Sequence, residues 1–454
     1  MAGRRQHFAA RSRKFAHFLG RIARFESSCG CPTDGRSALD KSFPPSHLAA
    51  MTELTADVLI IGGGLVGGPL ACALGGAGLR VVVVDGETPQ ATLAPSFDGR
   101  ASAVALAPQR MLAAIGLWPD IAPLAAPIMQ IRVSDGASPL FLHYDHAEIG
   151  DQPMGWIVEN RALRQAIQRG LARHDKVTLI APMRLAGLQR GPHGVQARLA
   201  DGRRIKAGLV VAADGRGSPV RESAGIGISK WDYGQTAIVC TLAHEKPHHD
   251  TAQEHFLPSG PFAILPLTGN RSSVVWSEQS HLVGPILAQN DADFLRELQS
   301  RFGDYLGALR LEGPRFSYPL SLQLAKHYTA QRLALIGDAA HGMHPVAGQG
   351  MNMGLRDVAA LAELLVDAKR LGQDLGDPRI LARYERWRRF DNLLMLGLTD
   401  GLVRLFSNDW LPVKLARDLG MAAVNRLPPL KHFFMRHAMG LVGDLPRLLR
   451  GQPL

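Results

Sequence analysis

The feature that most constrains this chain is a glycine-rich hexapeptide placed between a β-branched run and a helix pattern. The run covers residues 56–61, and the hexapeptide that follows is Gly62-Gly63-Gly64-Leu65-Val66-Gly67. A second apolar run, Val81–Val84, ends directly at Asp85. Strand, glycine turn, helix and strand in this order predict a β-α-β unit that binds the pyrophosphate of a dinucleotide.

Three of these glycines have separate expected roles. Gly62 permits the tight turn, Gly64 lets the backbone approach a pyrophosphate at the helix N-terminus, and Gly67 lets the helix pack on the strand. The Asp85 carboxylate is expected to accept hydrogen bonds from an adenosine ribose. This unit alone does not distinguish FAD from NAD.

The basic charge of the chain belongs to its two ends. The formal net charge is +11, yet residues 1–50 contain nine Lys/Arg against three Asp/Glu, and residues 401–454 contain eight against three. The middle of the chain is therefore neutral. Nucleic-acid binding needs a basic face on a folded module, and none is visible, so we expect no nucleic-acid partner.

One apolar stretch and the N-terminus bear on location. Residues 58–79 carry no charge, but they contain eight glycines and Pro69, so we expect no spanning helix. The first residues are rich in Arg and poor in acids, which fits either a transit peptide or an over-long gene start with Met51 as the initiator. We expect a cytoplasmic protein peripheral to the inner membrane in a bacterium, or a matrix-side protein if the N-terminus is a transit peptide.

A second group of residues, far along the chain, decides between the two dinucleotides. The apolar run 333–336 ends at Gly337-Asp338, where a carboxylate can bind a polyol hydroxyl. A loop with two glycines then leads into a long amphipathic helix pattern, whose N-terminal N–H groups can stabilise the negative charge of reduced flavin. The sequence therefore predicts FAD, with a flavin-ring loop formed by Pro345, Gly348, Gln349 and Gly350.

Three segments in this order closely resemble the motifs of the p-hydroxybenzoate-hydroxylase-like aromatic monooxygenases. They are Asp98-Gly99-Arg100, the Asp-Gly segment around Asp214, and Gly337-Asp338 with the loop through Asn352. The resemblance covers about residues 54–440. It implies that Asp338 contacts the ribityl chain and that Arg100 lies near the flavin. The residues expected to bind FAD are thus Gly62, Gly64, Gly67, Asp85, Arg100, Asp214, Gly337, Asp338, Pro345, Gly348, Gly350 and Asn352.

Within this family, the segments 155–161, 231–235 and 260–267 resemble the ubiquinone-biosynthesis hydroxylases. The chain departs from the usual pattern with Asp at position 85, Met351, Met353 and the basic N-terminal extension. The resemblance implies a monooxygenase that hydroxylates the ring of a lipophilic polyprenylated phenol. NAD(P)H or an electron-transfer protein would reduce FAD, and O₂ would then add to form a C4a-hydroperoxide. Tyr233 and Gln235 would be either a sheet pair or substrate-binding residues, and no base can be assigned.

Other functions stay open at this point. A related flavoprotein, either a halogenase or an isoprenoid reductase, would share the same glycine motifs, although the W-x-W-x-I-P segment of halogenases is absent. A non-catalytic quinone-binding subunit of a membrane-associated biosynthetic complex would also keep them. His341 and His344 form an H-x-x-H, but a loop position beside Pro345 and the lack of a third ligand predict no metal site.

The predicted fold is α/β: a Rossmann-like FAD-binding domain of the p-hydroxybenzoate hydroxylase type, an inserted antiparallel-sheet substrate domain and a helical C-terminus. The C-terminal segment is apolar and basic, so it either packs on the flavin domain or lies at an anionic membrane surface or partner protein. The expected boundaries are 1–50 for a basic extension, 51–118, 154–228 and 326–400 for the FAD-binding domain, 119–153 and 229–325 for the substrate domain, and 401–454 for the C-terminal segment.

Overall fold

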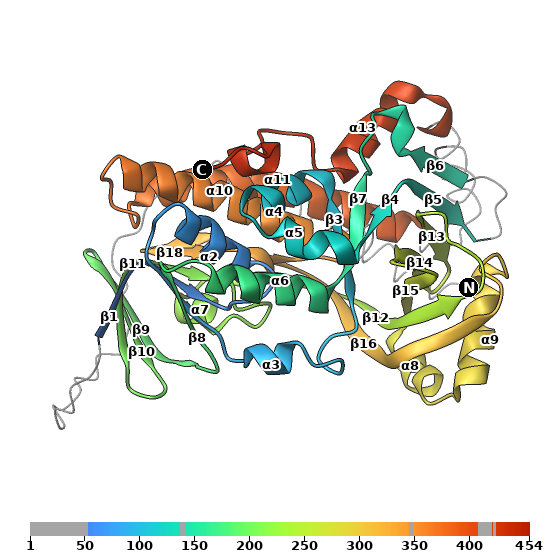
Figure 1. Ribbon diagram of the computed structural model, residues 1–454, viewed down its shortest axis with the longest axis horizontal. Coiled ribbons are helices and arrows are strands. Elements are labelled where there is room, and N and C mark those ends of the chain that lie inside the picture. The colour runs from blue at the N-terminus through green and yellow to red at the C-terminus, as the bar shows by residue number, and fades with distance from the viewer. Residues whose placement is uncertain (1–52, 137–140, 345–347, 407–419, 421–423) are drawn as a thin grey trace, which may run out of the picture. The chain divides into compact units, whose positions relative to one another are not determined.

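The computed structural model describes residues 53–136, 141–344, 348–406, 420 and 424–454 (Figure 1). The expected 1–50 extension, Pro345 and part of the 401–454 segment lie outside these residues. Met51–Leu454 forms one compact unit.

The first sheet is the predicted dinucleotide-binding sheet. Its strand order is β17-β18-β11-β1-β2-β8, and β10 and β9 extend it beside β11. The central neighbours β18, β11, β1, β2 and β8 are all parallel, whereas β9, β10 and β17 join it antiparallel. Its strands are β1 (Glu53–Ile61), β2 (Val81–Val84), β8 (Val177–Ile180), β9 (Leu185–Gly191), β10 (Gly194–Leu199), β11 (Arg204–Ala212), β17 (Thr329–Ala330) and β18 (Leu333–Leu335).

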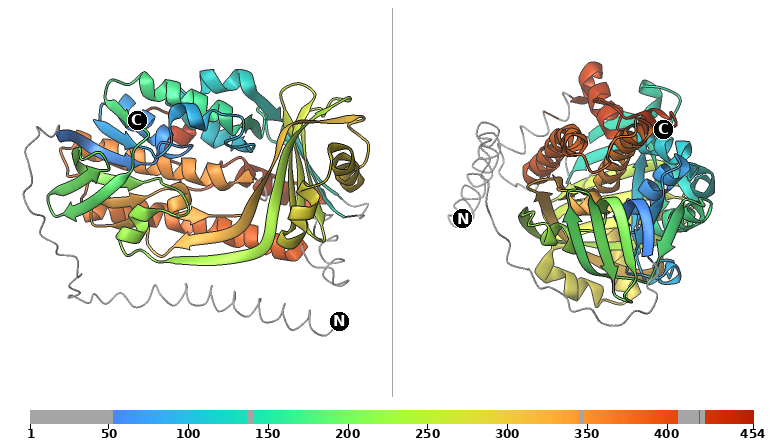
Figure 2. Two further views of the ribbon diagram at one scale, coloured as in Figure 1. Left: turned by 90° about the horizontal axis from the view of Figure 1, so that it is seen from below. Right: turned by 90° about the vertical axis from the view of Figure 1, so that its left-hand side faces the viewer.

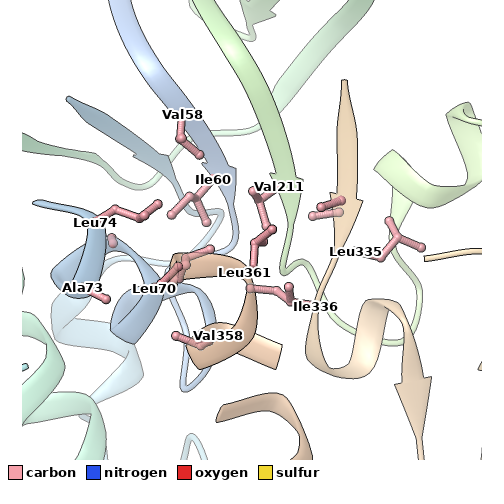
Figure 3. Close-up of a cluster of buried hydrophobic side chains, with 14 of the residues drawn as sticks. Val58, Ile60, Leu70, Ala73, Leu74, Val211, Leu335, Ile336, Val358 and Leu361 are labelled. Atoms are coloured by element: carbon pink, nitrogen blue, oxygen red, sulfur yellow. The ribbon is translucent and has the colours of Figure 1, made fainter. Parts of the chain in front are cut away.

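This sheet is buried between helices, which explains its continuous apolar strands. Figure 3 shows Val58 and Ile60 of β1 and Val211 of β11 packed with Leu70 of α2 and Leu361 of α10. All four residues of β2 are buried, as is nearly all of α2 (Gly67–Gly76). The charge-free run 58–79 is thus a buried strand, a glycine turn and a short buried helix.

The second sheet has the order β19-β16-β12-β15-β14-β13-β5-β6 and is antiparallel except for the parallel pair β13 and β5. The strands of a small third sheet, β3-β7-β4, pair antiparallel. The strands of these sheets are β3 (Ala101–Ala105), β4 (Ala125–Ile128), β5 (Gln130–Asp135), β6 (Phe141–Asp145), β7 (Gly155–Glu159), β12 (Ile228–His244), β13 (Thr251–Leu257), β14 (Gly260–Leu267), β15 (Arg271–Gln279), β16 (Leu309–Ala325) and β19 (His341–Gly342).

Two long strands connect the flavin half to the second sheet. Strands β12 and β16 pair along most of their length, from Ile228 opposite Ala325 to His244 opposite Leu309, and Figure 2 shows them running side by side. At one end β16 pairs with β19, directly after the Gly337-Asp338 turn. The other end carries the β15-β14-β13-β5-β6 ladder, so one strand pair fixes the second sheet relative to the flavin motifs.

Helices cover these sheets and form the C-terminal part. The long helices α10 and α11 pack against each other, and α10 also packs on α2 (Figure 1). In the described part of the chain, no helix is long and apolar enough to cross a membrane. The helices are α2, α3 (Pro89–Thr92), α4 (Leu106–Ala114), α5 (Trp118–Ile121), α6 (Asn160–Ala172), α7 (Pro219–Ser223), α8 (Ser280–Leu287), α9 (Asp291–Phe302), α10 (Gly350–Arg370), α11 (Pro378–Phe406) and α13 (Pro428–Ala438).

The predicted fold class is confirmed, with two additions that the sequence pattern did not indicate. Helices α8 and α9 interrupt the region that alternation predicts as sheet alone. Their polar residues fit helix ends: the Asn290 side chain accepts the Asp293 N–H at 2.9 Å and begins α9, and Gly303 ends it with φ +85°. The division into discontinuous domains stays a proposal.

Candidate active site

The glycine turn after β1 has one crowded side and one open side. Gly62 has φ +99°, and a Cβ there would lie 2.4 Å from the Ala213 carbonyl oxygen. A Cβ on Gly67 would lie 1.9 Å from the Gly62 carbonyl oxygen, whereas a Cβ on Gly64 would meet nothing within 4 Å. Gly62 and Gly67 are therefore required by packing, and Gly64 leaves space at the N-terminus of α2.

Asp85 holds this turn in place. Its Oδ2 accepts the Gly63 N–H at 2.6 Å, and its Oδ1 accepts the Glu87 N–H at 2.9 Å. Both oxygens thus have a backbone donor. Ribose binding by Asp85 stays a prediction, and it would use the remaining acceptor capacity of the carboxylate.

Asp338 lies in the short turn Gly337–Ala339 that follows β18, as the sequence predicts. Its Oδ2 is 3.2 Å from Nε of Arg216, which belongs to the Asp-Gly segment. The Arg216 guanidinium also donates to the carbonyl oxygens of Ser321 and Met343 at 3.0 and 3.2 Å. One arginine therefore joins the two motifs, although they are more than a hundred residues apart in the chain.

A buried carboxylate holds the backbone of the Gly337-Asp338 turn. Asp357, on α10, is fully buried, and its Oδ2 accepts the Gly337 N–H at 3.0 Å and lies 2.5 Å from Nε2 of His341. Its Oδ1 accepts the Arg388 Nε–H at 2.9 Å. Burial would raise the pKa of Asp357, but its interactions with His341 and Arg388 outweigh burial and lower the pKa to about 2. The carboxylate stays charged and fixes the turn.

Arg100 is held by a second buried carboxylate, Asp98. The Arg100 side chain donates to both Asp98 oxygens at 2.8 and 2.9 Å. Arg164, Asn160 and Tyr318 donate to the same carboxylate at 2.6, 3.0 and 3.2 Å. These donors outweigh the effect of burial and hold the pKa of Asp98 well below its usual range. The arginine is therefore positioned in advance of any ligand.

In the loop before α10, the positive φ occurs at Gly348 and not at Gly350. Gly348 has φ +61°, and a Cβ there would lie 2.8 Å from the Ala103 Cβ. A Cβ on Gly350, the first residue of α10, would meet only Met343 Cγ at 3.9 Å. The Asn352 side chain accepts the Ala105 N–H at 3.0 Å and donates to the Gly348 carbonyl at 3.3 Å. Asn352 thus ties the loop to β3.

A single cavity of about 1030 Å³ runs along these motifs and into the second sheet. It exceeds the 300–1,000 Å³ typical of small-molecule sites. Three groups of residues line it: the flavin motifs, apolar strand residues, and residues of the C-terminal segment. The three groups are Leu65, Arg100, Gly337, Asp338, Gly348, Gln349, Gly350 and Asn352; Ile131, Val133, Leu142, Ala252, Ala263 and Leu265; and Leu405, Phe406, Gly420, Val424, Phe434 and Ala438.

Tyr233 and Gln235 lie outside the lining of this cavity. The Tyr233 hydroxyl donates to Asp400 Oδ1 at 2.9 Å, and the Gln235 amide donates to the Ser259 carbonyl at 2.7 Å. Of the two alternatives that the sequence left open, these contacts favour a structural role, and substrate binding by Tyr233 and Gln235 stays untested. Tyr233 also contacts the ring of His344, whose pKa burial and then Arg216 lower to about 3.

Asp214 is half-buried beside the cavity, between the lining residues Ala213 and Gly215. Its Oδ2 accepts the Val220 N–H at 3.3 Å, and its Oδ1 has no hydrogen-bond partner among the described residues. Burial raises the pKa of this carboxyl. An unpaired buried oxygen is costly unless a ligand supplies a donor, so Asp214 fits a hydroxyl-rich cofactor.

The residues present fit FAD. The open side of Gly64, the unpaired Asp214 oxygen and the Asp338 carboxylate lie along a site that already has its charges paired and its glycines fixed. A flavin dinucleotide needs a pyrophosphate site at a helix start, acceptors for its hydroxyls and a backbone loop at its ring. Fold and site together define a flavin-dependent oxidoreductase.

Comparison with known proteins gives the family. The sequence family described as FAD binding domain matches residues 55–390. Ubiquinone hydroxylase UbiL of Rhodospirillum rubrum is 61% identical over 417 residues, which cover 90% of this chain and 97% of that protein. The 3-demethoxyubiquinol 3-hydroxylase of Escherichia coli is 35% identical and covers 86% of this chain and 100% of its own length. This chain belongs to the FAD-dependent hydroxylases of ubiquinone biosynthesis.

A solved structure supports the fold. The p-nitrophenol 4-monooxygenase PnpA of Pseudomonas putida superposes with a TM-score of 0.74, covering 87% of this chain and 100% of its own, at 20% identity. The predicted family, FAD dependence and monooxygenase class are confirmed.

Several residues of the site were absent from the sequence prediction. Asp357 accepts the Gly337 N–H, and Asn160 donates to Asp98. Arg216 joins the Asp214 segment to Asp338. The sequence pattern could have indicated Asp357, because it is a charged residue on the apolar face of the predicted helix. It could also have indicated Glu254, which stands between Ala252 and Phe256 on the inward face of an alternating strand.

Proposed function

We propose that this enzyme hydroxylates the aromatic ring of a polyprenylated phenol during ubiquinone biosynthesis. The observation that carries the proposal is the long cavity, which runs from the flavin loop through an apolar sheet face to the C-terminal helices. A phenol ring fits at the flavin loop while a long isoprenoid tail needs apolar lining over many ångströms. The name of the Escherichia coli relative, a demethoxyubiquinol hydroxylase, agrees with such a substrate.

When bound, FAD reduced by NAD(P)H or an electron-transfer protein activates O₂ and supplies an electrophilic oxygen. The residues of this chain bind, orient and exclude water. Arg100, held by Asp98, contributes a fixed positive charge at the flavin end. The backbone of Gly348 and the first turn of α10 offer N–H groups to a negative ring edge. Apolar side chains of β5, β13 and β14 keep water from the ring.

We also propose the FAD-binding residues named from the sequence, with Asp338 as the one whose loss matters most. Replacing Asp338 by Ala removes an acceptor and leaves Arg216 without its ion pair. The variant should be purified with much less flavin than the wild-type protein, as measured by absorbance. Lys206, which pairs with Glu53 near the N-terminal ends of β11 and β1, offers a control in Lys206→Ala. Full flavin occupancy of Asp338→Ala would reject this assignment.

The substrate is tested by deleting the gene and identifying the accumulated quinone intermediate by mass spectrometry. We expect an intermediate that lacks one ring oxygen and disappears on complementation with the wild-type gene. An unhydroxylated intermediate that is also cleared by a flavin-free Asp338→Ala variant would favour a non-catalytic subunit. A chlorinated product or a saturated isoprenoid chain would favour the halogenase or the reductase.

We further propose that helix α11 contacts an anionic membrane surface, which would explain how an insoluble tail reaches the cavity. Four apolar residues on one face of α11 are exposed, at 75%, 43%, 44% and 41% of their surface: Phe390, Leu394, Leu398 and Leu405. Arg383 and Arg386 continue this exposed face towards the start of the helix. We call these six residues the α11 stripe. Apolar and basic residues on one exposed helix face are typical of helices that lie at a membrane surface.

The α11 stripe reaches the cavity. Leu405 lines the cavity and is 41% exposed, and Phe434 of α13 lines it and is 37% exposed. The C-terminal end of the cavity therefore opens at the same surface. A partner protein in a ubiquinone-biosynthesis complex would bind this same surface. The vesicle experiment below distinguishes a membrane from a protein partner.

Flotation with vesicles containing anionic lipid tests the membrane contact. The wild-type protein should float at low salt and less at high salt, and Phe390→Ser/Leu394→Ser should float much less in both. Leu371→Ser is the matched control, because Leu371 is 72% exposed but lies outside α11 and outside the cavity lining. Equal flotation of the wild type and the double variant would reject the membrane contact and favour a protein partner.

A further inference from the structure

Strand β13 places one carboxyl on the apolar wall of the cavity. Side chains alternate along a strand, and Ala252, Glu254 and Phe256 share the face that lines the cavity, which Gln253 also reaches. His255 points to the opposite face, where its Nδ1 lies 2.7 Å from the Ser134 hydroxyl. The direction of Glu254 is therefore set by the strand and not by a flexible loop.

The register of the sheet surrounds this carboxyl with apolar side chains. Glu254 lies opposite Ala263 of β14 and Val133 of β5. The next residues in the same row are Val275 of β15 and Leu142 of β6. All five residues line the cavity. A carboxyl in such a row costs free energy and contributes nothing to packing, so it calls for a ligand.

No hydrogen bond or ion pair to another described residue satisfies the Glu254 carboxyl. Asp98 and Asp357 differ from it, because each accepts several donors. Burial raises the pKa of Glu254 to about 7, without a contribution from a neighbouring charge. The group can therefore exchange a proton near neutral pH, which is the range in which a general base is most effective.

We propose, on the basis of the proposed function, that Glu254 binds the hydroxyl of the phenol substrate and accepts its proton. The proton passes from the phenol oxygen to a Glu254 carboxylate oxygen, so the carboxylate becomes neutral and the phenol becomes a phenolate. No carbon bond changes in this step. The phenolate is the more electron-rich ring and hence the better acceptor of an electrophilic oxygen. A phenol has an ordinary pKa near 10, so transfer to a group of pKa about 7 is an uphill step that the later reaction completes.

Other ionisable groups bear on the same cavity. Arg100, Arg216 and Asp338 line its flavin end, and Tyr144 of β6 lines its sheet end. Burial raises the pKa of Tyr144 to about 12, so Tyr144 keeps its proton over the working range. Asp135 follows Val133 by two residues on β5. The cavity-lining residues of β14, namely Pro261, Ala263 and Leu265, do not ionise.

Two measurements on the purified flavoprotein test Glu254. The first is kcat/KM for a short-tailed phenol against pH. For the wild type it should rise as pH increases through about 7, because the base must lose its own proton first. Glu254→Gln should lower the rate about a hundredfold or more and remove this rise. Glu254→Asp should keep part of the rise, and Glu53→Gln, the same change on an exposed residue of the flavin sheet, should leave it unchanged.

The second measurement is the ultraviolet difference spectrum of the bound phenol, which needs no turnover. In the wild type the phenol band should move to longer wavelength as pH rises through about 7, because the hydroxyl then donates to an ionised carboxylate, and Glu254→Gln should bind the phenol without that pH-dependent shift. A wild-type rate and pH profile in Glu254→Gln, or an unchanged spectral shift, would overturn the proposal. A wild-type protein that binds the phenol but does not hydroxylate it would contradict the proposed function alone, and the spectral shift would still decide the role of Glu254.

Discussion

The flavin motifs and the sheet wall of the cavity treat their carboxyl groups in opposite ways. Behind the flavin motifs, Asp98 and Asp357 are surrounded by donors that keep them charged. On the sheet wall, Glu254 has no such partner among the described residues, and burial raises its pKa to about 7. Paired carboxylates shape the backbone before the cofactor binds, whereas an unpaired one remains available to a substrate. The comparison separates residues that build the site from one that can react.

The largest effect is expected for a carboxylate that fixes the backbone of the site. Asp357→Asn should lower the free energy of unfolding by about 3 kcal/mol, because Arg388 keeps only Asp391 as a charged partner and one Asn oxygen cannot serve both Arg388 and the Gly337 N–H as two carboxylate oxygens do. Urea denaturation and flavin content would measure it. Asp367→Asn, on the same helix but with a half-exposed carboxylate, should cost far less. Equal losses in the two variants would show that Asp357 does not organise the turn.

Substituting Glu254 should change the free energy of unfolding in the opposite direction. Because burial raises its pKa from 4.5 to about 7, the folded protein keeps a proton that the unfolded chain releases, and stability falls as pH rises between these values. At pH 8, Glu254→Gln should therefore be more stable than the wild type, by on the order of 1–2 kcal/mol. At pH 4 the difference should vanish. A variant that is equally stable or less stable than the wild type at pH 8 would remove the contrast with Asp357.

The flavin loop allows a sharper test within three residues. Gly348→Ala should cost about 1–2 kcal/mol, because alanine is strained at φ +61° and its Cβ would press on Ala103. Gly350→Ala should fold as well as the wild type, since its Cβ would meet only Met343 Cγ at 3.9 Å. Gly350→Ala should instead differ from the wild type by weaker flavin binding and slower turnover. Thermal unfolding of both variants would decide, and equal losses would contradict the assignment of strain to Gly348.

The smallest effect is expected where the cavity reaches the surface. Phe434→Ala should raise KM for a long-tailed phenol about threefold to tenfold and leave a short-tailed one unchanged, because only the tail extends to Phe434. Phe433→Ala is the control, since Phe433 is 50% exposed but does not line the cavity. Unfolding free energies should change by no more than about 0.5 kcal/mol. A similar rise in KM for both substrates would place the tail elsewhere.

The same contrast explains what the sequence could predict. The glycines of the first turn, Asp338 and the loop before α10 are short local patterns, because backbone approach to a dinucleotide needs them at fixed spacing. The Rossmann-like unit and the antiparallel region therefore followed from periodicity and motif order. The role of Asp357 depends on α10 packing beneath a turn, and that of Glu254 on the register of five strands. Such contacts between distant segments have no signature in spacing.

Two details depended on tertiary packing for the same reason. The sequence left open whether Tyr233 and Gln235 form a sheet pair or bind substrate, and in the structure their side chains donate to Asp400 and Ser259. The sequence pattern indicated only strands over 231–319, and helices α8 and α9 lie within that region.

Hydroxylation is tested most directly by supplying ¹⁸O₂ to the purified flavoprotein with a reductant and a phenol, and by measuring the mass of the product. We expect a ring-hydroxylated product that carries one ¹⁸O atom and forms only when flavin is bound. A product without added oxygen, or one whose new oxygen comes from water, would contradict it.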